Sequence, residues 1–216
     1  MKYKLAVFDM DGTVLDTLED LTDAVNYALL KLDMPKRRID EIKTFVGNGI
    51  PKIIERSLPD GFTEQNFKKA YYYFTDYYKY HCKDKTKAYD GVLEAIDKLK
   101  SLGVKTCVVS NKDDYAAREL AELYFPKRFD FVLGRVDGVN KKPAPDMVNI
   151  ALNYFKVEKS EAVYIGDSDV DYLTAENSSL DFIGVDWGFK GYDFLKNLGA
   201  KTVVRYPYEI VNIIAE

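Results

Sequence analysis

An acidic pair near the N-terminus is the first group of residues whose types and spacing indicate chemistry. Asp9 and Asp11 lie directly after the apolar run Lys4–Phe8, and Gly12 and Thr13 follow them. Two carboxylates at one strand end repel each other unless a counter-charge is present, and Mg²⁺ prefers oxygen ligands of this kind. The pair therefore predicts a metal site, with an ordinary acidic turn at a strand end as the alternative.

A second acidic cluster follows another apolar run. Asp167 and Asp171 come shortly after Val163–Ile165. A calcium loop of the EF-hand type would need glycine at its sixth position and glutamate at its twelfth. The segment that begins at Asp167 has Tyr172 and Ser178 at those positions, so this type of site is excluded. Hydrogen bonding to the start of a helix is the other role for such a segment.

Three polar residues elsewhere could bind an anion. Lys142 precedes a proline in a stiff loop, and Ser110 and Asn111 follow the β-branched run Val104–Val109. A lysine close to several carboxylates stays charged and can meet an anionic substrate, while serine and asparagine can donate hydrogen bonds to phosphate oxygens. Taken one at a time, a solvated lysine and a helix start are the alternatives.

The pattern of apolar residues indicates how these groups come together. Short apolar runs alternate with amphipathic helices from Gly91 onwards, and the expected strands are 4–8, 104–109, 129–133, 162–165, 181–185 and 202–204. This alternation predicts a Rossmann-like α/β core, with a mainly parallel sheet covered by helices. Ligands bind beyond the carboxyl ends of the strands in such sheets, so the four polar segments are expected to converge on one crevice.

The stretch between the first two strands has a different pattern. Helical spacing begins after Thr17 and continues to about residue 81, with turns at Gly47–Gly49 and Pro59–Gly61. No strand is expected between about residues 15 and 100. We therefore expect an α/β core formed by residues 1–15 and 88–216, into which residues 16–87 are inserted as an all-helical cap domain.

Composition narrows the classes of function. The 216 residues include 31 Lys and Arg against 35 Asp and Glu, so the net charge of −4 argues against nucleic acid or a membrane as the main partner. Two cysteines and one histidine exclude a disulfide framework and a zinc site of several imidazoles. No apolar run approaches the roughly 18 residues of a membrane span, so a cytoplasmic location is expected.

The four polar segments together resemble the motifs of the haloacid-dehalogenase-type phosphohydrolase superfamily. These motifs are Asp-x-Asp-Gly-Thr, Ser-Asn, Lys-Pro and Gly-Asp-Ser-x-x-x-Asp, and here they occur in that order over nearly the whole chain. The insertion resembles the small helical cap of one subgroup. Within it, Gly47, Asn48 and Gly49 resemble the substrate-facing loop of phosphoglycolate-phosphatase-type members, with a plain helix–helix turn as the alternative.

The resemblance implies a role for each motif residue. Asp9 would attack phosphorus and form an aspartyl-phosphate, and Asp11 would act as general acid and then as general base. It also implies a Mg²⁺ site and a phosphate site. The metal residues would be Asp9, Asp11 through its main-chain carbonyl, Asp167 and Asp171. Of these, Asp171 would hold the water shell of the metal or Lys142. The phosphate residues would be Thr13, Ser110, Asn111 and Lys142.

These roles imply a Mg²⁺-dependent phosphatase that acts on a small phosphorylated metabolite, with 2-phosphoglycolate as the best single candidate. Asp11 argues against the dehalogenases of the superfamily, which lack the second aspartate. A sugar-phosphate phosphatase and a β-phosphoglucomutase-like phosphotransferase stay open. So does a signalling module in which Asp9 accepts a phosphoryl group without turnover. A monomer or homodimer is expected.

Overall fold

Residues 2–216 are described by a computed structural model, and they divide into two compact units. In the described residues the larger unit comprises residues 2–15 and 88–216, and the smaller unit comprises Asp16–Lys87. No helix among the described residues is both long and apolar enough to cross a membrane.

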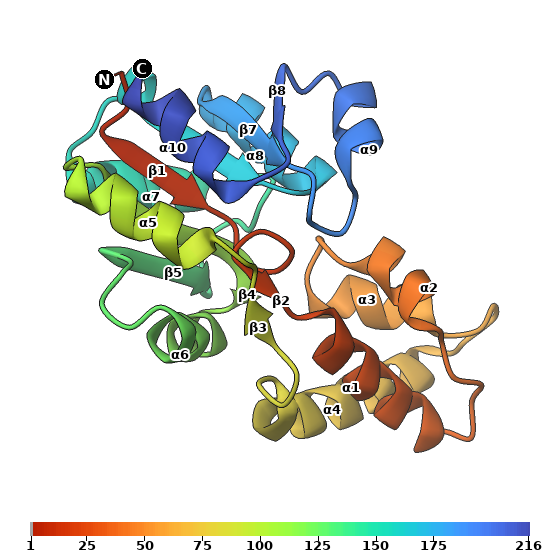
Figure 1. Cartoon of the computed structure of the whole chain (residues 1–216). Coiled ribbons are helices and arrows are strands. Elements are labelled where there is room, and N and C mark those ends of the chain that lie inside the picture. Colours follow the sequence, from red (N-terminus) through yellow and green to blue (C-terminus); the bar gives the residue numbers. More distant parts are fainter. Residues whose placement is uncertain (1) are drawn as a thin grey trace. The chain divides into compact units, whose positions relative to one another are not determined.

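The larger unit is built on a parallel sheet (Figure 1). In the described residues this sheet has six strands, in the order β5 (Phe131–Arg135), β4 (Lys105–Asp113), β1 (Leu5–Phe8), β6 (Ala162–Gly166), β7 (Asp181–Val185) and β8 (Thr202–Val204). Every neighbouring pair is parallel. The chain passes from β1 to β4 on one side and only later to β6 on the other. The order therefore reverses at β1, which is where such sheets bind ligands.

Helices cover both faces of this sheet. In Figure 1, α5 (Val92–Ser101) and α10 (Pro207–Ala215) lie over one face, and α7 (Asp146–Phe155) and α8 (Asp169–Ser178) lie over the other. The remaining helices of the unit are α6 (Asp114–Tyr124), η1 (Lys159–Glu161) and α9 (Tyr192–Asn197). Alternate β1 residues such as Val7 share a buried hydrophobic cluster with Met147 and Val148 of α7. Each such buried side chain contributes about 1.5–3 kcal/mol. The predicted α/β core is confirmed.

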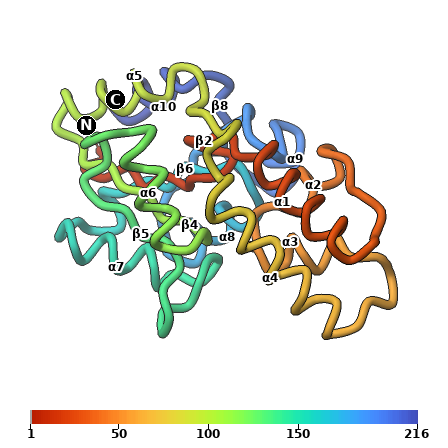
Figure 2. Tube along the Cα trace, turned by 90° about the horizontal axis from the view of Figure 1, so that it is seen from below, coloured from red at the N-terminus to blue at the C-terminus, as the bar shows by residue number. Residues whose placement is uncertain are grey.

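The smaller unit is helical and has its own core. It contains α1 (Leu18–Leu30), α2 (Ile39–Phe45), α3 (Ile50–Ser57) and α4 (Glu64–His81). α1 packs along α4 (Figures 1 and 2), and Val25, Phe74 and Tyr78 are buried. The Thr63 hydroxyl accepts a hydrogen bond from the main-chain N–H of Asn66, which explains why α4 begins at Glu64.

A buried carboxylate holds the end of the smaller unit in place. Asp20 of α1 accepts hydrogen bonds from the main-chain N–H groups of Lys85 and Thr86 and from the Thr86 hydroxyl. These residues lead directly into β3 (Lys87–Ala88). The carboxylate thus fixes the path by which the chain leaves the helical unit.

The structure differs from the sequence-based expectations at three places, one of which is β5, where the strand spans Phe131–Arg135 instead of 129–133. The expectation of no strand between residues 15 and 100 is wrong, because β2 (Leu15–Asp16) pairs with β3. Two-residue strands are too short to show an alternating pattern. In addition, β4 continues to Asp113 instead of ending at Val109, because its polar end still pairs with β5 after a shift of register.

Candidate active site

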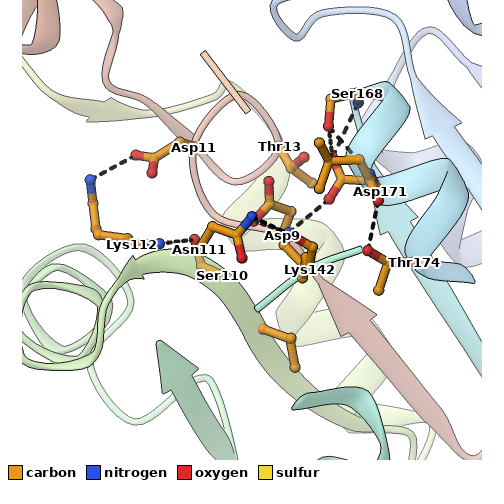
Figure 3. A network of polar contacts seen from close by, with 12 residues as sticks. Asp9, Asp11, Thr13, Ser110, Asn111, Lys112, Lys142, Ser168, Asp171 and Thr174 are labelled. Carbon is orange, nitrogen blue, oxygen red and sulfur yellow. Dashed lines mark hydrogen bonds and ion pairs between the residues drawn. The ribbon is translucent and has the colours of Figure 1, made fainter. Parts of the chain in front are cut away.

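The carboxyl ends of three neighbouring strands carry the site. Asp9 follows β1, Ser110 and Asn111 belong to the end of β4, and Asp167 follows β6. Because β1 lies between β4 and β6, side chains from distant parts of the sequence meet at one edge of the sheet (Figure 3). Lys142, from the loop before α7, reaches the same place.

Lys142 is buried and connects two of the aspartates. Its Nζ lies 2.7 Å from Asp9 Oδ1 and 2.8 Å from Asp171 Oδ1, and it donates a hydrogen bond of 2.9 Å to the Tyr164 hydroxyl. The contacts with Asp171 and Tyr164 are hydrogen bonds, and the contact with Asp9 is an ion pair. Burial by itself lowers the pKa of Lys142, but the carboxylates of Asp171 and Asp9 outweigh it and raise that pKa well above its ordinary value. The side chain is therefore a fixed positive charge.

Both carboxylate oxygens of Asp171 already have partners in the protein. Its Oδ2 accepts hydrogen bonds from the main-chain N–H groups of Asp167 and Ser168 and from the Ser168 hydroxyl. Its Oδ1 contacts Lys142 and Tyr164. Although Asp171 is close enough to the other aspartates to share an ion with them, we expect it to act by holding Lys142 and the start of α8.

Negative charge on Asp9 and Asp167, the other two aspartates of the cluster, is unfavourable. Burial, followed by the nearby Asp171 carboxylate, raises the pKa of Asp9 to about 7, although Lys142 opposes the shift. Burial and the charges of Asp171 and Asp9 also raise the pKa of Asp167 well above its ordinary value. Three carboxylates and one ammonium leave a charge of −2 when all are ionised.

A divalent cation fits this charge and these donor atoms. Oxygen atoms from Asp9, Asp167 and Asp171 all lie within 4.8 Å of one another. With Asp171 engaged elsewhere, the carboxylates that would hold the ion are those of Asp9 and Asp167. A hard cation such as Mg²⁺ takes one or two carboxylates and completes its shell with water and substrate oxygens.

A loop after β7 holds Asp167 in place. The main-chain N–H of Phe189 donates a hydrogen bond of 2.7 Å to Asp167 Oδ2, and the Thr13 hydroxyl donates one of 3.2 Å to Oδ1. Trp187 Nε1 in turn donates to the Thr13 carbonyl. A Cβ at Gly188 would lie 2.2 Å from the Asp167 Cβ, so only glycine fits there. Thr13, expected to bind phosphate, has its hydroxyl on Asp167 here.

Sequence reasoning assigned no function to this loop. A signal for the loop was the stretch Val185–Gly188, which resembles the segment after the fourth motif in the same subgroup and contains a glycine, the residue typical where backbones approach closely.

The residues at the end of β4 lie where the strand pairing is irregular. The register between β4 and β5 shifts between Val109 and Asp113. Such irregularities change the direction of side chains and are frequent beside active sites. Within this stretch, Asn111 Nδ2 donates to the Lys142 carbonyl, and the Ser110 hydroxyl accepts from the Lys112 N–H. Asn111 thus steadies the lysine loop, in addition to its predicted contact with phosphate.

Lys112 was missed by the sequence reasoning. Its side chain is only 3% exposed, and its Nζ lies 3.0 Å from Asp11 Oδ1. Figure 3 shows Asp11 directed towards Lys112, while Asp9 contacts Lys142. The two aspartates of the first motif therefore pair with two different lysines.

The predicted specificity residues belong to the smaller unit. Gly47, Asn48 and Gly49 form the connection between α2 and α3, and both glycines have positive φ, 119° and 84°. Such angles explain why glycine occupies these positions. Contact of this turn with a substrate stays a prediction.

Comparison with known proteins agrees with the fold and the motifs. The family model for haloacid dehalogenase-like hydrolases matches residues 6–185. A phosphoglycolate phosphatase of Psychrobacter arcticus is 32% identical, and the match covers 88% of this chain and 86% of that protein. A protein of Caldanaerobacter subterraneus that is named as a pyrophosphatase is 30% identical over 99% of this chain and 96% of its own length.

A solved structure gives the same result. The crystal structure of a Lactobacillus delbrueckii protein, named as a phosphoglycolate phosphatase, is 37% identical. It superposes with a TM-score of 0.94 and covers 99% of both chains. This chain therefore belongs to the haloacid dehalogenase-like hydrolase family and is an enzyme related to its phosphoglycolate phosphatases.

Proposed function

We propose that this enzyme is a Mg²⁺-dependent phosphatase that hydrolyses a small phosphomonoester. The observation that carries the proposal is the surroundings of Asp9. This carboxylate lies at the strand-order switch, 2.7 Å from a fixed lysine charge and within reach of the Asp167 carboxylate. A nucleophile beside a cation site and a buried ammonium suits attack on a phosphoryl group, whose oxygens carry dispersed negative charge.

The reaction would proceed in two displacements on phosphorus. An Asp9 carboxylate oxygen attacks phosphorus, the bond to the ester oxygen breaks, and Asp11 gives its proton to that leaving oxygen. Asp11, now ionised, then removes a proton from water as the water oxygen attacks the phosphorus of the aspartyl-phosphate. The bond to the Asp9 oxygen breaks, which releases inorganic phosphate and returns both aspartates to their starting states.

The remaining residues would bind and orient the phosphoryl group. Lys142 supplies positive charge, and Ser110 and Asn111 supply hydrogen-bond donors from β4. Bound Mg²⁺ would offset the negative charge of the aspartates and of the phosphate dianion. The proposed ligands are the carboxylates of Asp9 and Asp167 and the main-chain carbonyl of Asp11.

The substrate proposed first is 2-phosphoglycolate. Its support is the names of the relatives, together with Asp11, which suits an alkyl ester because the departing alkoxide needs a proton. The pyrophosphatase name of one relative makes inorganic pyrophosphate the second compound to test. Sugar phosphates, the mutase alternative and the non-turnover phosphoacceptor are distinguished by the same experiment.

The test is phosphate release from a panel of esters with Mg²⁺ and with EDTA. The panel contains 2-phosphoglycolate, pyrophosphate, β-glucose 1-phosphate and p-nitrophenyl phosphate. We expect release only with Mg²⁺, its loss in Asp9→Asn, and normal release in Asp137→Asn, which changes an exposed aspartate of the same unit. Isomerised sugar phosphate without free phosphate would indicate a mutase. One phosphorylation without sustained release would indicate a phosphoacceptor.

The cytoplasmic location, the monomeric or homodimeric state and the exclusion of nucleic acid and membranes as partners stay predictions from the sequence.

A further inference from the structure

Lys112 is a buried charge that the proposed mechanism does not use. Among the described residues only two lysines are buried, Lys112 and Lys142. A buried ammonium is costly unless a nearby anion compensates its charge. The anion beside Lys112 is Asp11, at 3.0 Å, and the Asp11 side chain is itself only 17% exposed.

The backbone around Lys112 is held on both sides. Its N–H donates to the Ser110 hydroxyl, and Asp113 lies opposite Arg135 of β5 and forms an ion pair with its guanidinium. Gly134 of β5 is so close that a Cβ there would lie 2.6 Å from the Lys112 carbonyl oxygen. The lysine therefore extends from a rigid point at the end of β4, where the irregular pairing directs it towards the first motif.

We propose that Lys112 is a positioning residue for Asp11: it holds the Asp11 carboxylate away from Asp9, in the orientation for proton transfer. The inference rests on the proposed phosphatase function. Two aspartates only two residues apart must do different work, one as nucleophile and one as proton carrier. The structure separates them by giving each its own lysine, Lys142 for Asp9 and Lys112 for Asp11.

This role predicts an effect that depends on the leaving group. Replacing Lys112 by methionine keeps the length of the side chain and removes its charge, so the Asp11 carboxylate loses its anchor. An alkoxide needs the proton from Asp11, whereas p-nitrophenolate leaves without one. A lysine that only stabilised the fold would affect both kinds of substrate equally.

The first test compares kcat/KM for an alkyl phosphate and for p-nitrophenyl phosphate in Lys112→Met. General acid catalysis contributes about 10²–10⁴-fold, so we expect a loss of about 10- to 100-fold on the alkyl ester and less than about 3-fold on the aryl ester. Lys105→Met, at an exposed position of the same strand, should change neither. Lys112→Arg should restore part of the alkyl activity. Equal losses on both substrates, or no loss on either, would overturn the proposal.

A double-mutant cycle with Asp11→Asn tests the same point independently. If Lys112 acts through Asp11, Lys112→Met should cause no further loss of alkyl activity in the Asp11→Asn background. Additive losses would overturn the proposal. The double variant removes both charges of the Lys112–Asp11 pair, so it can fold even if Lys112→Met alone folds poorly. In that case Lys112→Gln replaces Lys112→Met as the single variant of the cycle. Failure of the wild type to hydrolyse either ester would contradict the phosphatase function instead.

Discussion

Replacing Asp9 by asparagine should make the metal-free protein more stable relative to the wild type as the pH rises. The reason is that ionisation of the buried Asp9 side chain lowers the free energy of unfolding. Burial and Asp171 raise its pKa from 3.8 to about 7. Between these values the folded protein keeps the Asp9 proton that the unfolded chain has lost, so the free energy of unfolding falls with rising pH. Asparagine has nearly the same shape and does not ionise.

The size of the effect follows from the width of this interval. One pH unit corresponds to about 1.4 kcal/mol, so an interval of about 3 units gives an upper limit of about 4 kcal/mol. The stabilising contribution of the protonated carboxyl is complete below about pH 4 and is lost as the pH rises through about 7. Asp167 has a raised pKa as well, and the Asp9 charge contributes to that rise, so Asp9→Asn relieves part of it and the change acts in the same direction.

The assay is urea unfolding of wild type and Asp9→Asn in EDTA, from pH 5 to pH 8. We expect the wild type to lose about 2–3 kcal/mol relative to the variant over this range. Asp137→Asn should follow the wild type at every pH. Mg²⁺ should then stabilise the wild type more than Asp9→Asn, because only the wild type keeps that carboxylate ligand. A difference between the two proteins that does not change with pH would refute the reasoning.

Three further predictions concern neighbouring residues. Asp11→Asn should reduce kcat/KM for an alkyl phosphate far more than for p-nitrophenyl phosphate, and equal losses would exclude Asp11 as the proton donor. Gly188→Ala should weaken Mg²⁺ binding, measured by calorimetry, because its Cβ would displace Asp167; unchanged affinity would show that the loop does not hold this ligand. Asp171→Asn should lower the free energy of unfolding by about 3–5 kcal/mol, measured in urea, because it removes a partner of buried Lys142. A loss below about 1 kcal/mol, typical of exposed ion pairs, would contradict that role.

The architecture of the core was predictable because its strands are apolar and regularly spaced. β7 and β8 begin and end at the predicted residues, since each apolar run stops where the buried strand stops. β4 does not end at the predicted residue, because its last residues are polar and are held by pairing with β5. The convergence of Asp9, Asp167 and Lys142 follows from topology, because the carboxyl ends of parallel strands share one edge.

What the sequence did not show are the partners that hold the site residues in place. Lys112 follows Ser110 and Asn111 directly, but a lysine near a strand end is usually solvated, whereas here it is buried at the irregularly paired end of β4. The bond from Phe189 to Asp167 uses a main-chain N–H, which no side-chain pattern can indicate. Such contacts depend on tertiary structure and have no local signal.

The most direct test of the account is to trap the phosphorylated enzyme. The protein is mixed with Mg²⁺ and the best ester of the panel, quenched in acid within one turnover, digested, and analysed by peptide mass spectrometry. We predict one added phosphoryl group on the peptide that contains Asp9, at the side chain of that residue, and none in Asp9→Asn. Rapid phosphate release with no phosphoryl group on Asp9, and with Asp9→Asn still active, would contradict the central claim that Asp9 is the nucleophile.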